Sequence, residues 1–397
     1  MNQTLTAPKG FKTGSAACGL KTGGALDLGI LVCETDAACA ACFTQNTVQA
    51  APILISREHL KTGRARALVV NSGNANACTG DRGLSDALTM TQLLADKLHV
   101  SARQVLVAST GVIGRFLNME KITKGIDAAW ANLGGDADAG AAFARAIMTT
   151  DRRPKTAYRE FDVDGQTIRL AGSAKGAGMI APNLATMLAF ITTDAKIAPA
   201  DLRSHLVQAV GRTFNRITVD GQMSTNDAVV VLASALAGPQ EIGHAWQSPF
   251  GQHLYELCNE LALAIVADGE GATKVFHVTV TAARSFTQAR RIAQAVAESL
   301  LVKTAIHGGD PNWGRIISAA GACGADFKPH AASCAIGNVV VFEKGMGTEP
   351  NARPLAEIMK TDDIWITLDL HEGDASDIVH SCDLSKDYVD INALYHT

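Results

Sequence analysis

The chain has 397 residues, 47% hydrophobic and 19% charged, which predicts roughly two or three structural units and excludes a mainly disordered protein. Its formal charge of −4 includes no cluster of lysines and arginines, so no nucleic-acid partner is expected. Nine cysteines scattered from Cys18 to Cys382 argue against a disulfide framework and predict a reduced, cytoplasmic location.

The sequence predicts neither a membrane span nor a metal site. The first ten residues lack an apolar stretch of signal-peptide length, and the longest apolar run, Ala228–Gly238, is too short to cross a bilayer. Cys39-Ala-Ala-Cys42 has CxxC spacing, but no second cysteine pair or histidine pair completes a zinc site. We therefore expect no metal cofactor.

Apolar periodicity predicts a mixed α/β chain whose sheets are covered by helices. Apolar or β-branched runs that end at turn residues predict strands at residues 26–33, 65–71, 104–108, 187–193, 228–235 and 275–280. Apolar residues at helical spacing predict one helix that Ser85 caps and that extends to Leu98. A second helix is predicted over residues 287–302.

The glycine-rich segment Gly172–Ala181 offers two simple interpretations. Its Gly176-x-Gly178-x-x-Ala181 spacing matches the loose dinucleotide fingerprint, but the run Phe190–Thr193 predicts a strand where that fingerprint needs a helix. The chain contains no GK[ST] tripeptide, which excludes a phosphate-binding P-loop. In the second interpretation the glycines form a turn between two strands and Thr186 is an ordinary strand residue.

The residues around Thr186 also suit backbone self-cleavage. Pro182 fixes the backbone, and the small Ala185 stands directly before a hydroxyl residue, so the Thr186 hydroxyl could attack the Ala185 carbonyl. Hydrolysis of the resulting ester would free an N-terminal threonine. Its α-amine, with a reference pKa of about 7.7–8.0, can act as the base for its own hydroxyl.

At this point the chain resembles the ornithine acetyltransferase family, also called the bifunctional glutamate N-acetyltransferases. Lys175–Leu188 (KGAGMIAPNLATML) is similar to the self-processing segment of that family. The resemblance continues in order along most of the chain, at Asn71–Asn76, Ser109–Gly114, Met148–Asp151, Phe214–Gly221, Ser224–Asp227, Asp268–Lys274 and Asp310–Arg315.

The resemblance implies an acetyltransferase of arginine biosynthesis that processes itself. Cleavage between Ala185 and Thr186 would give chains 1–185 and 186–397, which share one four-layer αββα fold and stay together, as a heteromer of the two fragments and in a higher oligomer. Thr186 would take an acetyl group from N2-acetylornithine and pass it to glutamate in a ping-pong reaction. This cycle needs no cofactor because the ester carries the acetyl group, and acetyl-CoA stands as a possible second donor.

The resemblance also implies roles for further residues. Thr110 and Gly111 match the oxyanion-hole positions, although the residues alone also fit a strand-to-helix turn whose hydroxyls cap the next helix. Lys175 matches a substrate-contacting lysine, and Glu270 matches a binding residue suited to the ornithine ammonium. Asn392 and Thr397 match positions that would hold the substrate α-carboxylate, on a tail that would ordinarily fray.

Two departures from the family pattern concern the substrate. Arg152 stands after Thr149-Thr150-Asp151, where the family usually has a substrate-binding threonine. It either carries its charge outward and leaves ornithine chemistry intact, which we favour, or reaches the site and shifts the preference toward an acidic substrate. The tail from Asn392 to Thr397 lacks the acidic residue and the arginine that are more usual inside it.

Two other function classes remain as alternatives at this point. An N-terminal-nucleophile amidase or aminopeptidase would resolve the same acyl-threonine with water instead of an amine. A non-catalytic protein would hold a dinucleotide or an amino acid in the glycine-rich loop, and its Ala185–Thr186 bond would stay intact. In every case the expected partners are small molecules.

Overall fold

The computed structural model describes residues 2–181, 187–349 and 352–394. Within these ranges the chain forms two compact units, the first from residues up to 215 together with 222–265, the second from 216–221 together with the residues from 266 onward. The expected cleavage between Ala185 and Thr186 falls outside the described residues. The division into two fragments therefore stays a prediction, separate from the division into units.

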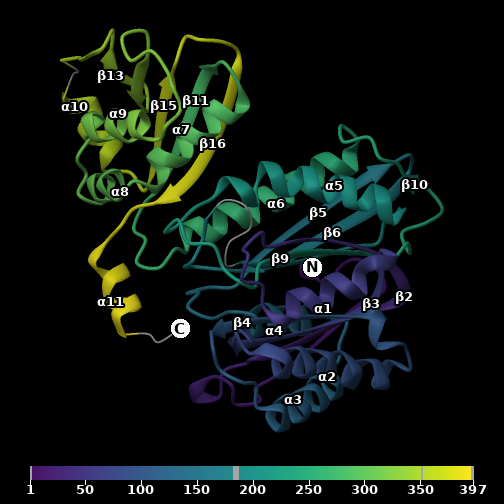
Figure 1. The fold of residues 1–397 in the computed structure, drawn as a ribbon. Helices are drawn as coiled ribbons and strands as arrows, with labels where there is room; N and C mark the ends of the chain where they lie inside the picture. The colour runs from purple at the N-terminus through teal and green to yellow at the C-terminus, as the bar shows by residue number, and fades with distance from the viewer. Residues whose placement is uncertain (1, 182–186, 350–351, 395–397) are drawn as a thin grey trace. The chain divides into compact units, whose positions relative to one another are not determined.

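In the described part of the first unit, eight strands form one sheet in the order β4-β3-β2-β9-β7-β6-β5, with β1 paired to β2 (Figure 1). Strand β2 is long and pairs with β3 at its start and with β9 at its end, and the register shifts between Val32 and Ala37. It therefore belongs to both halves of the sheet. The strands are β1 (Phe11–Ala16), β2 (Leu28–Phe43), β3 (Arg64–Asn74), β4 (Val105–Val112), β5 (Lys155–Val163), β6 (Gln166–Lys175), β7 (Leu188–Thr193) and β9 (Ala228–Ala233), with a separate parallel pair β8 (Lys196–Ile197) and β10 (Glu241–Ile242).

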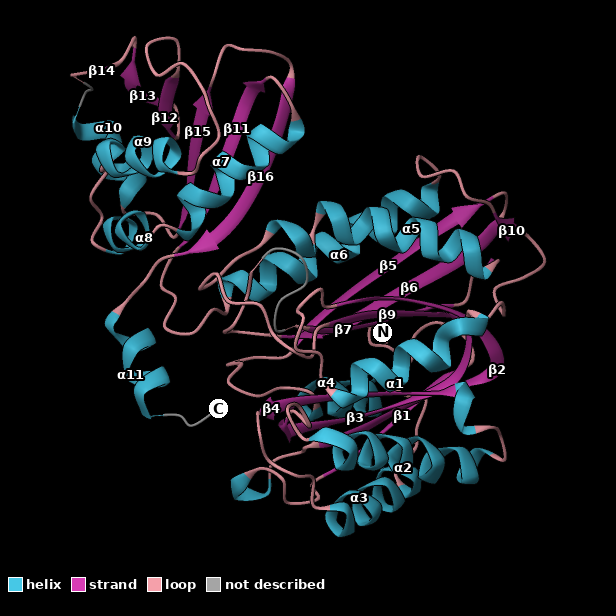
Figure 2. Cartoon of the chain, viewed as in Figure 1, coloured by secondary structure: helices cyan, strands magenta, loops and turns pink. Residues whose placement is uncertain are grey.

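The described helices of this part of the chain are α1 (Ala51–His59), α2 (Gly80–Leu98), α3 (Met119–Ala131), α4 (Ala137–Ala146), α5 (Pro199–Arg212) and α6 (Pro249–Ala267), with short 3-10 turns η1 (Thr22–Gly24), η2 (Leu60–Thr62), η3 (Ala102–Gln104) and η4 (Phe214–Arg216). Helices α2 and α3 cover the outer face of one half of the sheet, and α5 and α6 cover that of the other (Figure 2). Helices α1 and α4 contribute Ile53 and Phe143 to the core between the halves.

Side chains on neighbouring positions of β3 show that both faces of the sheet are buried. Val70 joins Phe190 of β7 in a core between the two halves, whereas Val69 packs with Met90 of α2 on the outer face. On the other half, α6 lies close against Gly172 of β6. The order helix, sheet, sheet, helix confirms the expected four-layer αββα fold.

The second unit is a separate α/β arrangement, in keeping with the two or three structural units expected from the chain length, although no boundary was expected at residue 266. Its sheet runs β14-β13-β12-β15-β11-β16, and its core joins strand residues such as Val278 and Ile366 to helix residues such as Ile292. The elements are β11 (Val275–Ala283), β12 (Ser333–Ile336), β13 (Val339–Glu343), β14 (Met346–Gly347), β15 (Asp363–Asp369), β16 (Ala375–Cys382), α7 (Phe286–Glu298), α8 (Leu300–His307), α9 (Trp313–Ala322), α10 (Ala352–Met359) and α11 (Lys386–Leu394).

The structure corrects two details of the expected helices. Ser85 is not a cap, because α2 already begins at Gly80 and Ser85 lies inside it. The helix expected over residues 287–302 is two helices, because Ser299 has extended backbone angles and its side chain accepts the Val302 N–H as the cap of α8. The expected strands are present, several of them longer than predicted. In the described part of the chain, no helix combines the length and apolarity needed to traverse a bilayer.

Candidate active site

Polar motifs from both halves of the first sheet meet where their strands end or begin. Strands β3 and β4 are parallel, so the segments 71–74 and 109–112 lie side by side at one edge. In the other half, β6 ends at Lys175 opposite the first residue of β7, which in turn pairs with the first residue of β9. Hydrogen bonds join the two edges: the Asn226 amide, just before β9, donates to the carbonyl oxygens of Ala75 at 2.7 Å and Ser109 at 2.8 Å.

Thr110 and Lys175 form the centre of this arrangement. The Lys175 ammonium donates a hydrogen bond to the Thr110 hydroxyl oxygen at 3.0 Å, and both residues are buried. Thr110 lies within β4, and the next described α-helix begins only at Met119. The alternative in which Thr110 caps a following helix is therefore wrong, because its hydroxyl is engaged with a lysine from another strand.

Gly111, beside Thr110, occupies a position that only glycine fits without strain. Its φ is +130°, and an added Cβ would lie 2.4 Å from the backbone carbon of Gly73 on β3. The bare backbone lets β3 and β4 approach closely at their ends. A peptide group at such a strand end is the kind of donor from which oxyanion holes are built.

A buried carboxylate, Asp151, links three segments next to this pair. It accepts hydrogen bonds from the Lys155 ammonium at 2.5 Å and from the backbone N–H groups of Gly176 at 2.7 Å and Thr149 at 2.9 Å. Burial by itself would raise its pKa, but the charges of Lys175 and Lys155 outweigh burial and lower the pKa to about 2. Asp151 is therefore ionised at any ordinary pH.

Two more ionisable groups face Lys175. Burial lowers the pKa of Lys21 to about 8, opposed by the charge of Asp27 and reinforced by that of Lys175. Burial raises the pKa of Asp227 well above its usual range, opposed by a hydrogen bond from the Met187 N–H and by the charge of Lys175.

Asp227 fixes the backbone immediately after the predicted nucleophile. Its carboxylate accepts the Met187 N–H at 2.8 Å, and the Met187 carbonyl accepts the Ala228 N–H at 3.2 Å. The Asp227 carbonyl accepts the Thr44 N–H at 3.0 Å, which ties the same turn to the end of β2. The residue after position 186 is thus held on both sides.

In the second unit, the C-terminal helix docks on a glycine-bounded loop. The Asn392 amide donates to the Glu270 carboxylate at 2.9 Å, and the Ser385 hydroxyl donates to the Gly271 carbonyl at 2.6 Å. The Tyr388 hydroxyl donates to Asp220 at 3.2 Å. Burial raises the pKa of Tyr388, and the neighbouring Asp220 carboxylate raises it further. The described tail is therefore held in place, and it brings Glu270 and Asn392 together.

Comparison with known proteins decides the family. Residues 12–397 match the ArgJ family. The chain is 46% identical to the glutamate N-acetyltransferase of Methanocaldococcus jannaschii, covering 99% of this chain and 98% of that protein. It is equally 46% identical to the arginine biosynthesis bifunctional protein ArgJ of Geobacter sulfurreducens, over 98% of this chain and 99% of that protein. The chain belongs to the ArgJ family.

Among solved structures, the crystal structure of the arginine biosynthesis bifunctional protein ArgJ from Bacillus halodurans is 40% identical to this chain. It covers 51% of this chain and 97% of its own, with a TM-score of 0.49.

The structure brings the described site residues together in two groups. Thr110, Gly111 and Lys175 lie together in the first unit, and Glu270 with Asn392 in the second. Arg152 follows Asp151 and is exposed. Ala185, Thr186 and Thr397 lie outside the described residues, so their roles stay predictions. The described residues include no cluster of histidine, cysteine, aspartate or glutamate that could hold a metal ion.

Asp151, Asp227 and Asn226 contact the segments of this candidate site, but no role was predicted for them from the sequence. All three stand in quoted motifs, 148–151 and 224–227. For Asn226 and Asp227 the available signal was a polar pair directly before the fully buried strand β9, whereas Asp151 precedes β5, which is buried only in part. What it could not reveal was the partner, because the bonds connect segments far apart in the chain.

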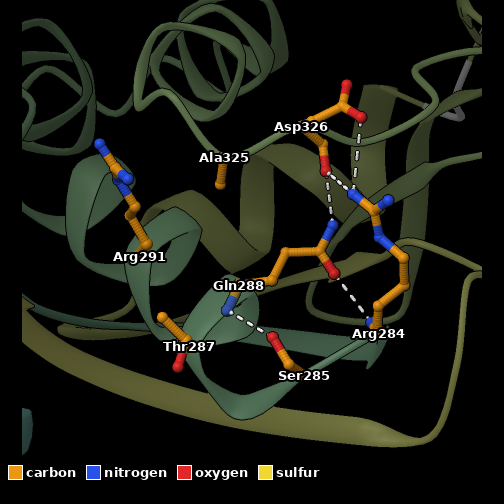
Figure 3. Close-up of a pocket in the computed structure, with 7 residues that line it drawn as sticks. All are labelled: Arg284, Ser285, Thr287, Gln288, Arg291, Ala325 and Asp326. Atoms are coloured by element: carbon orange, nitrogen blue, oxygen red, sulfur yellow. Dashed lines mark hydrogen bonds and ion pairs between the residues drawn. The ribbon is translucent and has the colours of Figure 1, made fainter.

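A pocket in the second unit contains none of the predicted site residues among those that line it (Figure 3). It has a volume of about 270 Å³ and lies at the start of α7. Its polar groups bond one another: the Gln288 amide accepts the Arg284 N–H at 2.8 Å and donates to the Asp326 carbonyl at 2.6 Å. We assign it no part in ArgJ chemistry.

Proposed function

We propose that this chain, an N-acetyltransferase of arginine biosynthesis by its family, transfers an acetyl group from N2-acetylornithine to glutamate through an acetyl ester on Thr186. The observation that carries the proposal is the buried contact between Lys175 and Thr110, next to the Asp227 carboxylate that holds Met187. Oxyanion donors and a fixed nucleophile backbone are the two things that acyl transfer to a threonine needs.

In this proposal the chain first cuts itself between Ala185 and Thr186. The Thr186 hydroxyl attacks the Ala185 carbonyl carbon, the C–N bond breaks as the nitrogen takes the hydroxyl proton, and water hydrolyses the ester. The freed α-amine then serves as the base for the same hydroxyl. The fragments stay together as a heteromer because residues of both, such as Leu68 and Phe190, share one core. The family resemblance extends this proposal to a higher oligomer of the paired fragments.

Each turnover has two acyl-transfer halves. Thr186 attacks the acetyl carbonyl of N2-acetylornithine, the Thr110 hydroxyl and the Gly111 N–H stabilise the oxyanion, and ornithine leaves. Glutamate's α-amine then attacks the ester carbonyl, the bond to the Thr186 oxygen breaks, and the proton lost by the amine restores the Thr186 hydroxyl as N-acetylglutamate leaves. Lys175, Glu270, Asn392 and Thr397 bind the amino-acid ends of the substrates, with Arg152 near them. No cofactor takes part, because the ester carries the acetyl group.

We also propose a second acetyl donor and a cellular location for the reaction. The free Thr186 hydroxyl would take an acetyl group from acetyl-CoA in the same way, forming the same ester as the CoA thiol leaves, which makes acetyl-CoA the second donor. We place the reaction in the cytoplasm, where substrates of amino-acid biosynthesis and reduced thiols are found. The nine cysteines, which all lie in the described part of the chain, are free.

Denaturing electrophoresis with N-terminal sequencing tests the proposal directly. Wild type should give two bands, the second beginning Thr186-Met-Leu, and should form N-acetylglutamate from N2-acetylornithine or acetyl-CoA. Thr186→Ala should stay full length and inactive, whereas Thr192→Ala, a buried threonine of β7 used as the control, should still be cut. An uncut wild type that transfers acetyl groups at full rate would refute the mechanism, and release of acetate alone would identify a hydrolase.

A further inference from the structure

The Thr110 hydroxyl has a hydrogen-bonding state that the structure defines. A hydroxyl has one hydrogen to donate and two lone pairs to accept with, whereas a lysine ammonium only donates. Because Lys175 donates to the Thr110 oxygen at 3.0 Å, the hydroxyl hydrogen must point to another acceptor. A hydroxyl that serves as an oxyanion donor must have its hydrogen available to point at the oxyanion before the reaction begins.

The direction of this bond is fixed only when Lys175 is charged, because a neutral amine could accept the hydroxyl hydrogen as well as donate. Lys175 is 2% exposed, and burial disfavours a charged ammonium. Lys21, from the loop before β2, and Lys155, from β5, carry further positive charge near the same cluster. A nearby negative charge is therefore needed to keep Lys175 protonated.

Asp151 supplies that charge. Two carboxylates interact with Lys175, Asp227 from the start of β9 and Asp151 from the segment before β5. Burial raises the pKa of Asp227 well above its usual range, whereas the pKa of Asp151 is about 2. Asp151 is the one that stays ionised across the pH range of an assay.

The backbone ties Asp151 to Lys175 in position as well as in charge. The Asp151 carboxylate accepts the N–H of Gly176, the residue after Lys175, at 2.7 Å. It also accepts the Thr149 N–H at 2.9 Å, which fixes the carboxylate at the end of its own segment. One side chain thus sets both the location of the Lys175 backbone and the charge of its ammonium.

We propose that Asp151 is a positioning residue that holds the Lys175 ammonium against the Thr110 hydroxyl and so aims the hydroxyl hydrogen at the oxyanion. This inference rests on the proposed function, because the oxyanion belongs to the acetyl-transfer reaction. In this proposal Asp151 acts without contact to substrate or reacting atoms. It acts on Lys175, whose contact with the Thr110 hydroxyl is separate from the contact with substrate proposed above.

The expected effect of Asp151→Asn is on turnover and on its pH dependence. The amide keeps the shape but removes the charge, so the pKa of Lys175 falls and its ammonium is lost as pH rises through the lower value. The basic limb of the kcat profile should move to lower pH by roughly one unit, with kcat reduced about tenfold at neutral pH. Asp194→Asn is the matched control. Asp194 is also a buried aspartate, and it accepts the Arg169 backbone N–H at 2.8 Å. This change should alter neither kcat nor the position of the basic limb.

A double-mutant cycle with Thr110→Ala tests the route of the effect. If Asp151 acts through Thr110, Asp151→Asn should lower kcat less than about twofold once the hydroxyl is gone, since coupled residues are not additive. A full tenfold loss in the Thr110→Ala background would overturn the inference. So would an Asp151→Asn enzyme whose kcat and basic limb equal those of Asp194→Asn.

Lys155→Met keeps the inference testable if Asp151→Asn does not fold. Removing this cation takes a positive charge away from the cluster and leaves the Asp151 charge unpaired by Lys155, so the basic limb should move to higher pH; an unchanged or lower limb would overturn the inference. Thr186→Ala, assayed alongside, reports on the proposed function separately. Activity in that variant would refute the function, whereas additivity in the cycle would refute only the role of Asp151.

Discussion

The predicted site residues occupy two regions of different construction. In the first unit, Thr110 and Lys175 are 4% and 2% exposed, sit on strands, and bond to buried partners. In the second unit, Asn392 is exposed on α11, a helix with no buried residues, and its bond to Glu270 lies at the surface. Rigid strand ends suit groups that must be aimed at a transition state, whereas a docked surface helix suits groups that bind and release a substrate. Changes in the first region should therefore affect turnover, and changes in the second should affect substrate affinity.

The largest effect is expected at Gly111. Gly111→Ala places a Cβ 2.4 Å from backbone carbon on β3 at a φ of +130°, so either the strands separate or the oxyanion-hole loop shifts. We expect the free energy of unfolding to fall by about 3 kcal/mol and kcat to fall more than about a hundredfold.

Gly114→Ala is the matched control for Gly111→Ala. Gly114 lies in the same motif at a φ of +78°, but an added Cβ meets nothing within 4 Å. Gly114→Ala should therefore lower the free energy of unfolding by only about 1–2 kcal/mol and leave kcat near the wild-type value. Chemical denaturation and steady-state kinetics on both variants check this. Equal losses in the two variants would mean that backbone angle alone, without the close approach of β3, explains the position.

An intermediate effect is expected at Asn392. Asn392→Ala removes the amide that bonds the Glu270 carboxylate at 2.9 Å, so Glu270 is less well oriented toward an ammonium group. KM for N2-acetylornithine should rise about three- to tenfold, as expected for one lost bond to a charged group near the surface, while kcat changes little. Val389→Ala, an exposed residue of the same helix, should change neither constant. A fall in kcat without a rise in KM would contradict the assignment of turnover to the first region and of substrate affinity to the second.

The smallest effect is expected at Arg152. Its side chain is exposed although its neighbour Asp151 is buried, which agrees with a charge carried outward. Arg152→Thr should change kcat/KM for N2-acetylornithine less than about threefold, as should Arg153→Thr beside it. A gain above about tenfold in Arg152→Thr alone would show that the guanidinium reaches the substrate and opposes its ammonium.

Local patterns predicted the elements that position the site but not the bonds that complete it. The apolar runs of β3, β4 and β7 were recognised because strand burial repeats along the chain. Ser85 was misplaced as a cap because several polar residues precede the apolar face of α2, and packing selects the start. The roles of Asp151 and Asp227 could not be predicted from the sequence, because they depend on contacts of their carboxyl groups with Lys155 and the Met187 N–H that only the fold creates.

The boundary of the second unit could not be located from the sequence for a related reason. Its boundary falls inside α6, between residues 265 and 266, where an apolar helix runs on without any linker composition. Glycine, proline and charge runs mark boundaries only when the chain between units is a loop. A continuous helix across the boundary leaves no such mark in the sequence.

The strand order of the first sheet has a consequence for when the chain can be cut. Strands β9 and β7, which follow the proposed cleavage point, lie between β2 and β6, which precede it. Residues 1–185 alone therefore have no neighbour to join β2 to β6, and synthesis must pass β9 before the sheet can close. Cleavage would then occur only in molecules whose first sheet has formed. In a fresh preparation, the full-length chain would represent molecules in which β7 and β9 are not inserted between β2 and β6.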